Sequence, residues 1–212
     1  MIAGKFISLE GVEGAGKSTL ARALQQQLER RGLDVLLTRE PGGTPLAERV
    51  RALLLERSSE TMNPTSEMLL MFAARAIHLD NAVRPALAAG RWVICDRFTD
   101  ASYAYQGAGR GVSTDLLDRL AAAVHADLWP ARTLLLDLPV EEGLARARQR
   151  SLVADRFESE QRAFFERVRA AYLQRARDHG ERIRLIDARA GAEQVSAAGW
   201  AAIVDLLPDA AA

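Results

Sequence analysis

Short apolar runs alternate with longer stretches of helical periodicity along the chain, and this alternation predicts the class of fold. Five runs are almost wholly apolar, as strands are when both faces of their sheet are covered. They span residues 6–9, 35–38, 92–95, 133–138 and 182–186. Strands separated by helices indicate right-handed crossovers between parallel strands. We therefore predict an α/β fold around a five-stranded parallel sheet.

Between the apolar runs, apolar residues recur at helical spacing, which places them on one face of each predicted helix. The first such face carries Leu20, Leu24 and Leu28, and Gly32 follows where a left-handed helix cap is expected. The later helices carry Leu116, Leu117, Leu120 and Val124, and then Phe165, Val168 and Tyr172. No internal repeat or linker interrupts this pattern, so we predict a single domain over residues 1–212.

A glycine-rich loop of the form GxxxxGK[ST] follows the first predicted strand directly. Its residues are Gly11, Val12, Glu13, Gly14, Ala15, Gly16, Lys17 and Ser18, with Thr19 next in a helical pattern. Glycines let backbone N–H groups converge on phosphate oxygens, and the helix N-terminus adds its positive end. Lys17 is expected to reach the outer phosphates of a nucleotide, and Ser18 to bind Mg²⁺. The alternative is a tight turn with an exposed lysine.

Composition and charge exclude several classes of protein. The 212 residues carry 28 basic and 28 acidic side chains, so we expect neither nucleic acid nor a membrane surface as a partner. The apolar runs are also far shorter than the roughly 20 residues of a membrane helix. A single cysteine, Cys95, and an N-terminus without the features of a signal peptide favour a cytoplasmic protein. All but two of the basic residues are arginine, and one of the two lysines is Lys17.

A regulatory GTPase is excluded by two missing motifs. The chain has two asparagines, Asn63 and Asn81, and neither is followed by lysine, so the guanine-reading NKxD motif is absent. No aspartate stands three residues before a glycine, so the DxxG switch motif is absent as well.

An Asp–Arg pair stands at the end of the third predicted strand, on the edge of the sheet where the glycine-rich loop is expected. Asp96 can order Mg²⁺ or its water ligands, and Arg97 can bridge phosphate groups. A solvated ion pair at a strand end is the competing interpretation.

Three further segments complete an ordered set of motifs. TREPGGT spans residues 38–44, FAAR spans residues 72–75, and YQG begins at Tyr105 and is followed by AGRG. With GVEGAGKST and DRF in the same order, these motifs resemble the thymidylate kinase family over nearly the whole chain. The resemblance implies ATP-dependent phosphorylation of dTMP to dTDP with Mg²⁺, in dTTP synthesis. It also implies a homodimer and a three-layer α/β/α P-loop fold with strand order 2-3-1-4-5.

The same resemblance implies roles for residues at the matched positions. Arg39 and Arg97 are expected to hold the dTMP phosphate, and Glu13 to contact the 3′-hydroxyl of its sugar. Phe72 is expected to stack on thymine, and Arg75, three residues later on one helix, to donate to a base carbonyl. The competing interpretation is a core phenylalanine beside an arginine whose stem is buried.

The same resemblance implies that the glycine-rich segment after the third strand supplies the remaining contacts to dTMP. Tyr105 resembles a ring that packs against the 2′ position of the sugar and disfavours ribonucleotides. Ser102 and Gln106 are candidates for polar contacts near the thymine edge.

Residues 144–158 resemble a mobile lid that closes over ATP in the bacterial branch of the family. In another branch an arginine follows the acid of the phosphate loop, but here that position is Gly14. The positive charge is therefore expected from the lid, with Arg150 near the transferred phosphoryl group, Arg146 near the adenine or its phosphates, and Arg156 reaching the phosphates on closure. A solvated basic helix is the alternative.

Two other functions stay open at this point. The first is a P-loop kinase for a different nucleoside monophosphate or for a deoxynucleoside. The second is a nucleotide sensor without catalytic activity, although a sensor has no need of a second phosphate site. His78, His125 and His179 show no metal-ligand spacing, so we expect structural or solvated roles for them.

Overall fold

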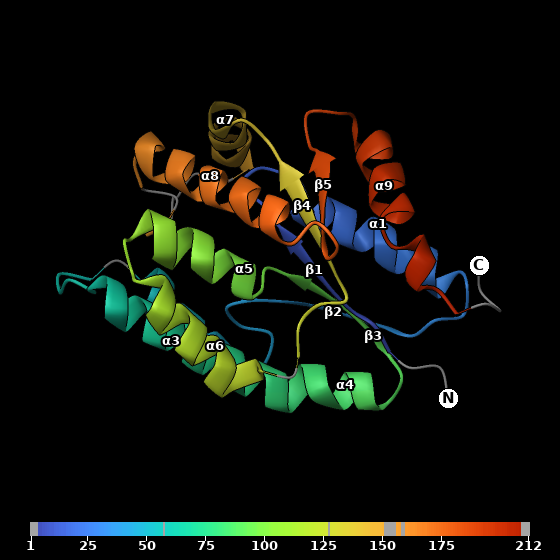
Figure 1. The fold of residues 1–212 in the computed structure, drawn as a ribbon, viewed down its shortest axis with the longest axis horizontal. Coiled ribbons are helices and arrows are strands. Elements are labelled where there is room, and N and C mark those ends of the chain that lie inside the picture. Colours follow the sequence, from blue (N-terminus) through green and yellow to red (C-terminus); the bar gives the residue numbers. More distant parts are fainter. Residues whose placement is uncertain (1–3, 57, 127, 151–155, 158–159, 209–212) are drawn as a thin grey trace.

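A five-stranded parallel sheet forms the middle layer of the molecule (Figure 1). Its strands are β1 (Phe6–Glu10), β2 (Val35–Arg39), β3 (Trp92–Asp96), β4 (Arg132–Asp137) and β5 (Ile183–Asp187). They lie in the order β2-β3-β1-β4-β5, and all neighbours are parallel. The predicted fold class and strand order are therefore confirmed, and each strand end lies within one residue of its predicted position.

This computed structural model describes residues 4–208 apart from 57, 127, 151–155 and 158–159, and it describes Arg150 by its backbone alone. The helices are α1 (Lys17–Glu29), α2 (Pro45–Leu55), α3 (Pro64–His78), α4 (Arg84–Ala88), α5 (Thr99–Ser102), α6 (Thr114–His125), α7 (Val140–Arg150), α8 (Arg162–Asp178) and α9 (Ala192–Ala201). Two wider helical segments, η1 (Leu79–Val83) and η2 (Tyr103–Gly109), continue α3 and α5, and a short turn, η3 (Val204–Leu206), follows α9. Within this described part of the chain, no helix is both long and apolar enough to cross a membrane.

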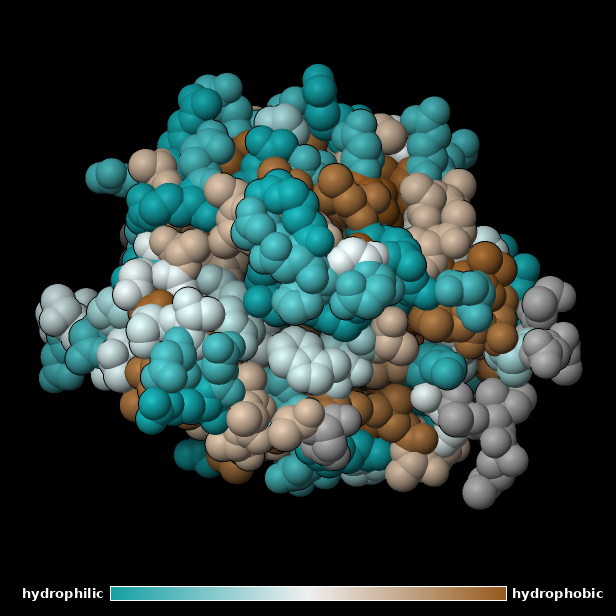
Figure 2. Space-filling model, viewed as in Figure 1, coloured by the Kyte–Doolittle hydropathy of each residue, from teal (hydrophilic) through white to brown (hydrophobic). Residues whose placement is uncertain are grey.

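Helices cover both faces of the sheet because successive strand residues point to opposite sides. On one face, Leu20, Leu24 and Leu28 of α1 pack in the same cluster as Ile7 and Ile94. On the opposite face, Val93 and Cys95 of β3 pack with Leu79, Val83 and Ala86 of η1 and α4. The sheet is thus the middle of three layers, as predicted. In the view of Figure 2, the outer surface is mostly hydrophilic and its apolar groups form separate patches.

Local sequence signals set the ends of several helices. Thr44 and Asn63 accept hydrogen bonds from the N–H groups of Ala47 and Ser66, and each is followed by a proline at the first helical position. Gly32 has a φ of 75° just after α1, as expected for a left-handed cap. The cap at Thr44 starts α2 directly after the Arg-Glu-Pro turn, whose residues Glu40 and Pro41 line the site described below.

Candidate active site

The glycine-rich loop between β1 and α1 curls over its own lysine. Lys17 is 7% exposed, and its Nζ donates hydrogen bonds to the carbonyl oxygens of Gly11 and Val12, both at 3.1 Å. Gly14 has a φ of 77°, and a Cβ at this position would collide with the carbonyl of Gly143. Burial lowers the pKa of Lys17 from its usual value. The loop therefore presents a buried ammonium group and the N-terminus of α1 to the same space.

Ser18 and Asp96 meet at the carboxyl edge of the sheet. Ser18 lies in the first turn of α1, Asp96 ends β3, and Ser18 Oγ donates to Asp96 Oδ2 at 3.2 Å. The other oxygen of the carboxylate, Oδ1, is buried without a hydrogen-bond partner. Hard cations such as Mg²⁺ prefer oxygen ligands of this kind. The two predicted metal ligands therefore lie together and fit a magnesium ion.

Arg97 is fixed beside the glycine-rich loop in a left-handed backbone conformation. Its φ is 73°, which costs a non-glycine residue about 1–3 kcal/mol, and its N–H donates to Leu9 O at 2.9 Å. Nη2 donates to Glu13 Oε1 at 2.6 Å, and Nη1 donates to Gly11 O at 3.1 Å. The guanidinium carbon lies 4.7 Å from the centroid of the Tyr105 ring. These contacts hold the cation at the junction of two pockets.

Arg97 lines two neighbouring pockets, which we call the side pocket and the loop pocket. Both are lined by Glu13, Glu40, Arg51 and Arg97. The side pocket is also lined by Met71, Arg75, Phe98, Ser102, Tyr105 and Gln106. The loop pocket is also lined by Gly14, Gly16, Lys17, Ser18, Arg39 and Asp96. Most of the predicted site residues therefore line one continuous cavity.

Arg75 brings an unused hydrogen-bond donor to the wall of the side pocket. Its Nε donates to Glu40 Oε2 at 2.7 Å, and its Nη2 donates to Ser102 Oγ at 3.1 Å. The guanidinium carbon lies 4.6 Å from the ring centroid of Phe72 and 5.1 Å from that of Phe98. Nη1 is buried and has no hydrogen-bond partner. A guanidinium can only donate, so this atom is suited to a carbonyl oxygen of a ligand.

Phe72 does not occupy the place that the sequence analysis predicts for it. Phe72 is 2% exposed and packs with Met68, Leu117 and Ala121 between α3 and α6. The preceding residue, Met71, lines the side pocket instead. Consecutive helical positions differ by about 100° around the axis, so only one of the two can face the pocket. We therefore correct the predicted stacking partner of the base: Phe72 supports Arg75 from beneath, and Met71 borders the cavity.

The remaining residues predicted for the side pocket all line it. Tyr105 is 6% exposed, and its hydroxyl donates to Glu13 Oε1 at 3.4 Å. Ser102 receives Arg75, and the Nε2 of Gln106 donates to Glu67 Oε1 at 2.8 Å. Glu67 was not predicted as part of this region, because an isolated acid in a helix gives no sequence signal of its own.

Arg39 lines the loop pocket, and its Nη2 lies 2.9 Å from both carboxylate oxygens of Glu48. Its side chain is 52% exposed. Arg51, which the sequence analysis missed, lines both pockets and donates from Nη1 to Pro41 O at 2.8 Å. The helical position of Arg51 in α2 shows no motif, so only the packing of α2 against the Arg-Glu-Pro turn brings it to the site.

Arg146 lies at a third pocket, on the far side of the glycine-rich loop. Small side chains dominate its wall, which is formed by Ala15, Gly16, Thr19, Leu20, Ala23, Arg146, Ala188, Ala190, Ala192, Val195 and Ser196. Arg146 donates from Nη1 to Ala188 O at 3.0 Å. We call this the alanine pocket. Its position beside the N-terminal turn of α1 places it next to the loop.

Of the arginines predicted for the lid, Arg156 has described contacts and Arg150 does not. Arg156 is bound to residues of α2 and α3: Nη2 lies 2.7 Å from Glu67 Oε2, and Nε donates to Leu54 O at 2.9 Å. It is not among the residues that line the loop pocket. The side chain of Arg150 and residues 151–155, on which much of the predicted lid depends, lie outside the described residues.

Glu10, which the sequence analysis did not single out, is linked to Arg97 through the Tyr172 hydroxyl, which both residues contact. It is fully buried and accepts hydrogen bonds from the Phe98 N–H and the Tyr172 hydroxyl, both at 2.7 Å. Burial, with the charge of Asp100 adding to it, raises the pKa of Glu10 from 4.5 to about 8. The native protein therefore retains a proton that the unfolded chain releases, so this group's contribution to stability falls as pH rises from about 4.5 through 8.

The variant Glu10→Gln tests whether Glu10 is protonated in the folded protein. The amide imitates the protonated carboxyl, because its oxygen can accept from Phe98 and its nitrogen can donate to Tyr172. We expect near-equal stability of the two proteins at pH 5, and a variant more stable by a few kcal/mol at pH 9. Urea unfolding at both pH values measures the difference. Parallel pH dependences in the two proteins would show that Glu10 is ionised throughout.

Comparisons with known proteins agree on one family. The family model described as thymidylate kinase matches residues 9–198. A thymidylate kinase of Ectopseudomonas mendocina is 57% identical over 194 residues, which cover 92% of each chain. That of Pseudomonas syringae pv. syringae is 60% identical over 185 residues, covering 87% of this chain and 88% of the relative. The crystal structure of thymidylate kinase from Ehrlichia chaffeensis is similar with a TM-score of 0.77, at 31% identity, over 97% of this chain and 100% of that one.

Proposed function

The chain belongs to the thymidylate kinase family and phosphorylates dTMP to dTDP with ATP as donor, and on this premise we propose how its pockets divide the reaction. The side pocket binds dTMP, and the loop pocket binds the phosphates of ATP. The observation that carries this assignment is that Arg75, whose Nη1 has no hydrogen-bond partner, lines a pocket that shares Glu13 and Arg97 with the loop pocket.

We propose that Arg75 selects the base of the acceptor. Its free Nη1 donates to a carbonyl oxygen of thymine, whereas the exocyclic amine of cytosine presents a second donor at the corresponding position. Ser102 and Gln106 line the same part of the pocket and are the further polar contacts. Met71 supplies an apolar wall beside the base.

The sugar of dTMP is placed between Tyr105 and Glu13. The Tyr105 ring lines the side pocket and leaves little room for a 2′-hydroxyl, and the Glu13 carboxylate can accept from the 3′-hydroxyl. Glu13 lines both pockets and already binds Arg97, so this arrangement brings the sugar and the phosphate of the acceptor to the loop.

The phosphate groups of both substrates meet among cations from separate segments. Lys17 binds the outer phosphates of ATP, Arg97 bridges donor and acceptor phosphates, and Arg39 binds the phosphate of dTMP. Phosphoryl transfer depends on positioning and on neutralising charge on the equatorial oxygens. When dTMP binds, Arg39 breaks its exposed ion pair with Glu48 and binds the phosphate, which is the stronger partner for a guanidinium group.

Ser18 and Asp96 would hold Mg²⁺ beside these phosphates. The unpartnered Oδ1 of Asp96 supports this assignment, because a buried carboxylate oxygen without a donor is suited to a cation or its water ligands. When bound, the ion supplies charge neutralisation on the phosphates of ATP.

The alanine pocket is the proposed site for the adenine of ATP. Alanine side chains leave flat apolar space beside the first turn of α1, and Arg146 stands at its edge on α7. The adenosine would then extend from the loop on the side opposite the dTMP pocket, which keeps donor and acceptor in line across Lys17 and Arg97.

Residues 144–158 are proposed to act as a lid that supplies further positive charge, and Arg150 is its catalytic arginine. We expect Arg150→Ala to lower turnover by about 10²-fold or more while the dTMP KM changes little, because a charge needed in the transition state is lost. Steady-state kinetics, with Arg148→Ala as a control from the same helix, measures this. An unchanged turnover number would remove Arg150 from the mechanism.

A homodimer in the cytoplasm is the proposed form of the protein. Leu53 on α2 and Leu69 on α3 are 54% and 49% exposed, and these two helices pack against each other, so they offer an apolar surface to a second copy. Light scattering of the purified protein measures its mass directly, and a monomer at micromolar concentration would contradict the dimer.

An acceptor panel assayed by ADP release tests the proposed function. We expect dTMP to give the highest kcat/KM among dTMP, dUMP, dCMP and dAMP, with dTDP as the product. A higher kcat/KM for dCMP or dAMP would overturn the assignment of the side pocket. Tight ATP binding without formation of dTDP would instead favour a nucleotide sensor.

A further inference from the structure

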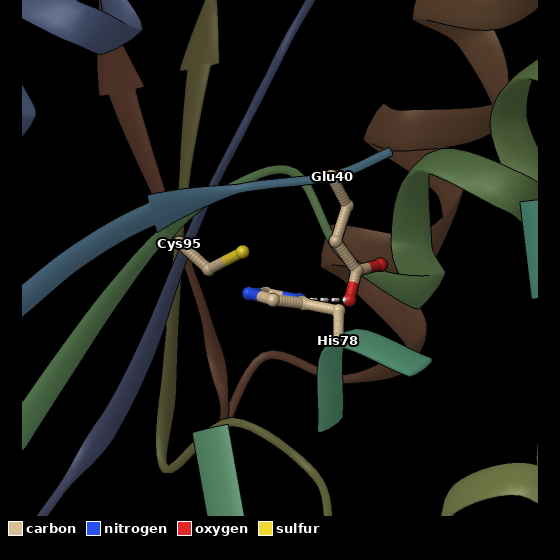
Figure 3. A group of neighbouring side chains, drawn as sticks. All are labelled: Glu40, His78 and Cys95. Atoms are coloured by element: carbon tan, nitrogen blue, oxygen red, sulfur yellow. Dashed lines mark hydrogen bonds and ion pairs between the residues drawn. The ribbon is translucent and has the colours of Figure 1, made fainter. Parts of the chain in front are cut away.

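Glu40, which lines both pockets, forms a buried cluster with His78 and Cys95 (Figure 3). Their ligand atoms lie within 4.8 Å of one another, a combination of residue types that can bind a transition metal. The ligand atoms already have partners, however. His78 Nδ1 lies 3.0 Å from Glu40 Oε1, His78 Nε2 lies 2.8 Å from Thr38 Oγ1, and Cys95 Sγ donates to Arg97 O at 3.0 Å. The cluster is therefore a hydrogen-bond network, and its contacts lead to Arg75.

Glu40 is held at both carboxylate oxygens by two residues of one helix. Arg75 and His78 are three positions apart on α3, so they lie on the same face and reach the same carboxylate. Arg75 Nε binds Oε2 at 2.7 Å, and His78 Nδ1 binds Oε1. Burial opposes the charge of Glu40, but Arg75 and His78 outweigh it and lower the pKa of this carboxyl. Glu40 is thus an ionised acceptor, which requires His78 to donate from Nδ1.

The His78 ring is also fixed from its other side. Thr38 Oγ1, at the end of β2, is hydrogen bonded to Nε2. The Arg-Glu-Pro-Gly-Gly turn passes so close that a Cβ at Gly43 would lie 2.7 Å from Nε2 and Cδ2 of the ring. These contacts fix the orientation of the ring, and with it the direction of the hydrogen bond from Nδ1 to Glu40.

We infer that His78 is a positioning residue for recognition of the base: acting through Glu40, it fixes the orientation of the Arg75 guanidinium at the wall of the side pocket. Without the bond from His78, Glu40 Oε1 would have to seek a second bond from Arg75, and rotation of the carboxylate would turn the guanidinium away from its present orientation. The inference rests on the proposed function of the side pocket. It concerns dTMP binding and base selection and leaves the transfer step unchanged.

Two amide variants separate this role from simple packing. In His78→Asn the amide nitrogen lies near the position of Nδ1 and can still donate to Glu40. In His78→Gln the amide extends to the position of Nε2, reaching Thr38 but leaving Glu40 without its donor. The two variants differ by one methylene group, so they form a matched pair.

We expect His78→Gln to raise the KM for dTMP about tenfold, with kcat within about twofold of the parent protein and the KM for ATP unchanged. The preference for dTMP over dCMP in kcat/KM is expected to fall by a similar factor. His78→Asn is expected to keep a KM for dTMP within about threefold of the parent. Steady-state kinetics with both acceptors measures these values, and thermal unfolding reports the stability of each variant.

The outcomes distinguish the inference from the proposed function beneath it. Equal dTMP KM values in both amide variants, or a loss confined to kcat or stability, would overturn the positioning role of His78. A parent protein that prefers dCMP would overturn the assignment of the side pocket instead. If His78→Gln does not fold, Thr38→Val replaces it: loss of the bond to Nε2 is expected to raise the dTMP KM about two- to threefold, and an unchanged KM would count against the inference.

Discussion

Replacing Lys17 by alanine is expected to lower turnover by about 10³-fold or more, because no other group of the loop carries its charge to the outer phosphates. Lys17 Nζ is held 3.1 Å from the Gly11 and Val12 carbonyls, and the side chain is almost fully buried. The ammonium group is therefore in place before ATP binds, and little reorganisation is needed. Burial lowers its pKa, so removing it relieves a desolvation cost and is not expected to unfold the domain.

The other lysine of the chain supplies the control. Lys5 precedes β1, on the end of the sheet opposite the phosphate loop, and Lys5→Ala is expected to keep turnover within about twofold of the parent protein. Coupled detection of ADP, with circular dichroism to check folding, measures both variants. A Lys17→Ala protein that retains a tenth of the parental turnover would contradict the role given to the loop.

Replacing Asp100 by alanine is expected to cost about 3–5 kcal/mol of unfolding free energy, because it leaves two guanidinium groups without their shared carboxylate. Asp100 is 1% exposed. Arg175 Nε donates to its Oδ1 at 2.6 Å, and Arg182 Nη1 donates to its Oδ2 at 2.7 Å. These partners belong to α8 and to the turn before β5, so Asp100 ties α5 to the edge of the sheet.

The matched control for Asp100 is an exposed ion pair. Asp115 and Arg119 lie one turn apart on α6, with side chains that are 72% and 76% exposed, so Asp115→Ala is expected to cost less than about 0.5 kcal/mol. Urea unfolding measures both variants. Equal costs for the two substitutions would show that burial of Asp100 adds nothing to its ion pairs.

Stability at low pH depends on the same group. Burial would raise the pKa of Asp100, but the hydrogen bonds and charges of Arg182 and Arg175 lower it below its usual value. The stabilisation from a lowered pKa is present above the unfolded value, near 3.9, and is lost as pH falls through the folded value. The Asp100→Ala protein is therefore expected to lose less stability than its parent between pH 5 and pH 3.

The phosphate loop was accessible to sequence reasoning because its chemistry lies within consecutive residues. The glycines, Lys17 and Ser18 all belong to one turn and to the first turn of the helix that follows it. The strand predictions succeeded for a similar reason, since a strand covered on both faces is apolar at nearly every position. Asp96 was predictable from its place at the end of β3, because parallel strands end at the same edge of a sheet.

The side pocket was predicted less well, because the orientation of a helix decides which of its residues face a ligand. The FAAR motif identified α3, but the rotation of that helix places Met71 at the cavity and Phe72 against α6. Sequence analysis predicted only a structural or solvated role for His78, since a lone histidine carries no local signal. Its contact with Glu40 spans 38 residues of chain and arises only when α3 packs beside the end of β2.

The sequence by itself determined the order of elements, the phosphate-binding loop, the two candidate metal ligands and the family to which these motifs point. These features depend on hydrogen bonding and burial within one strand, turn or helix, where neighbouring residues suffice. Only the tertiary structure decided how charged side chains are paired: Arg97 with Glu13, Arg156 with Glu67, and Asp100 with two arginines. Arginine is abundant along this chain, and the choice among its possible partners depends on which segments the folded sheet brings together and buries.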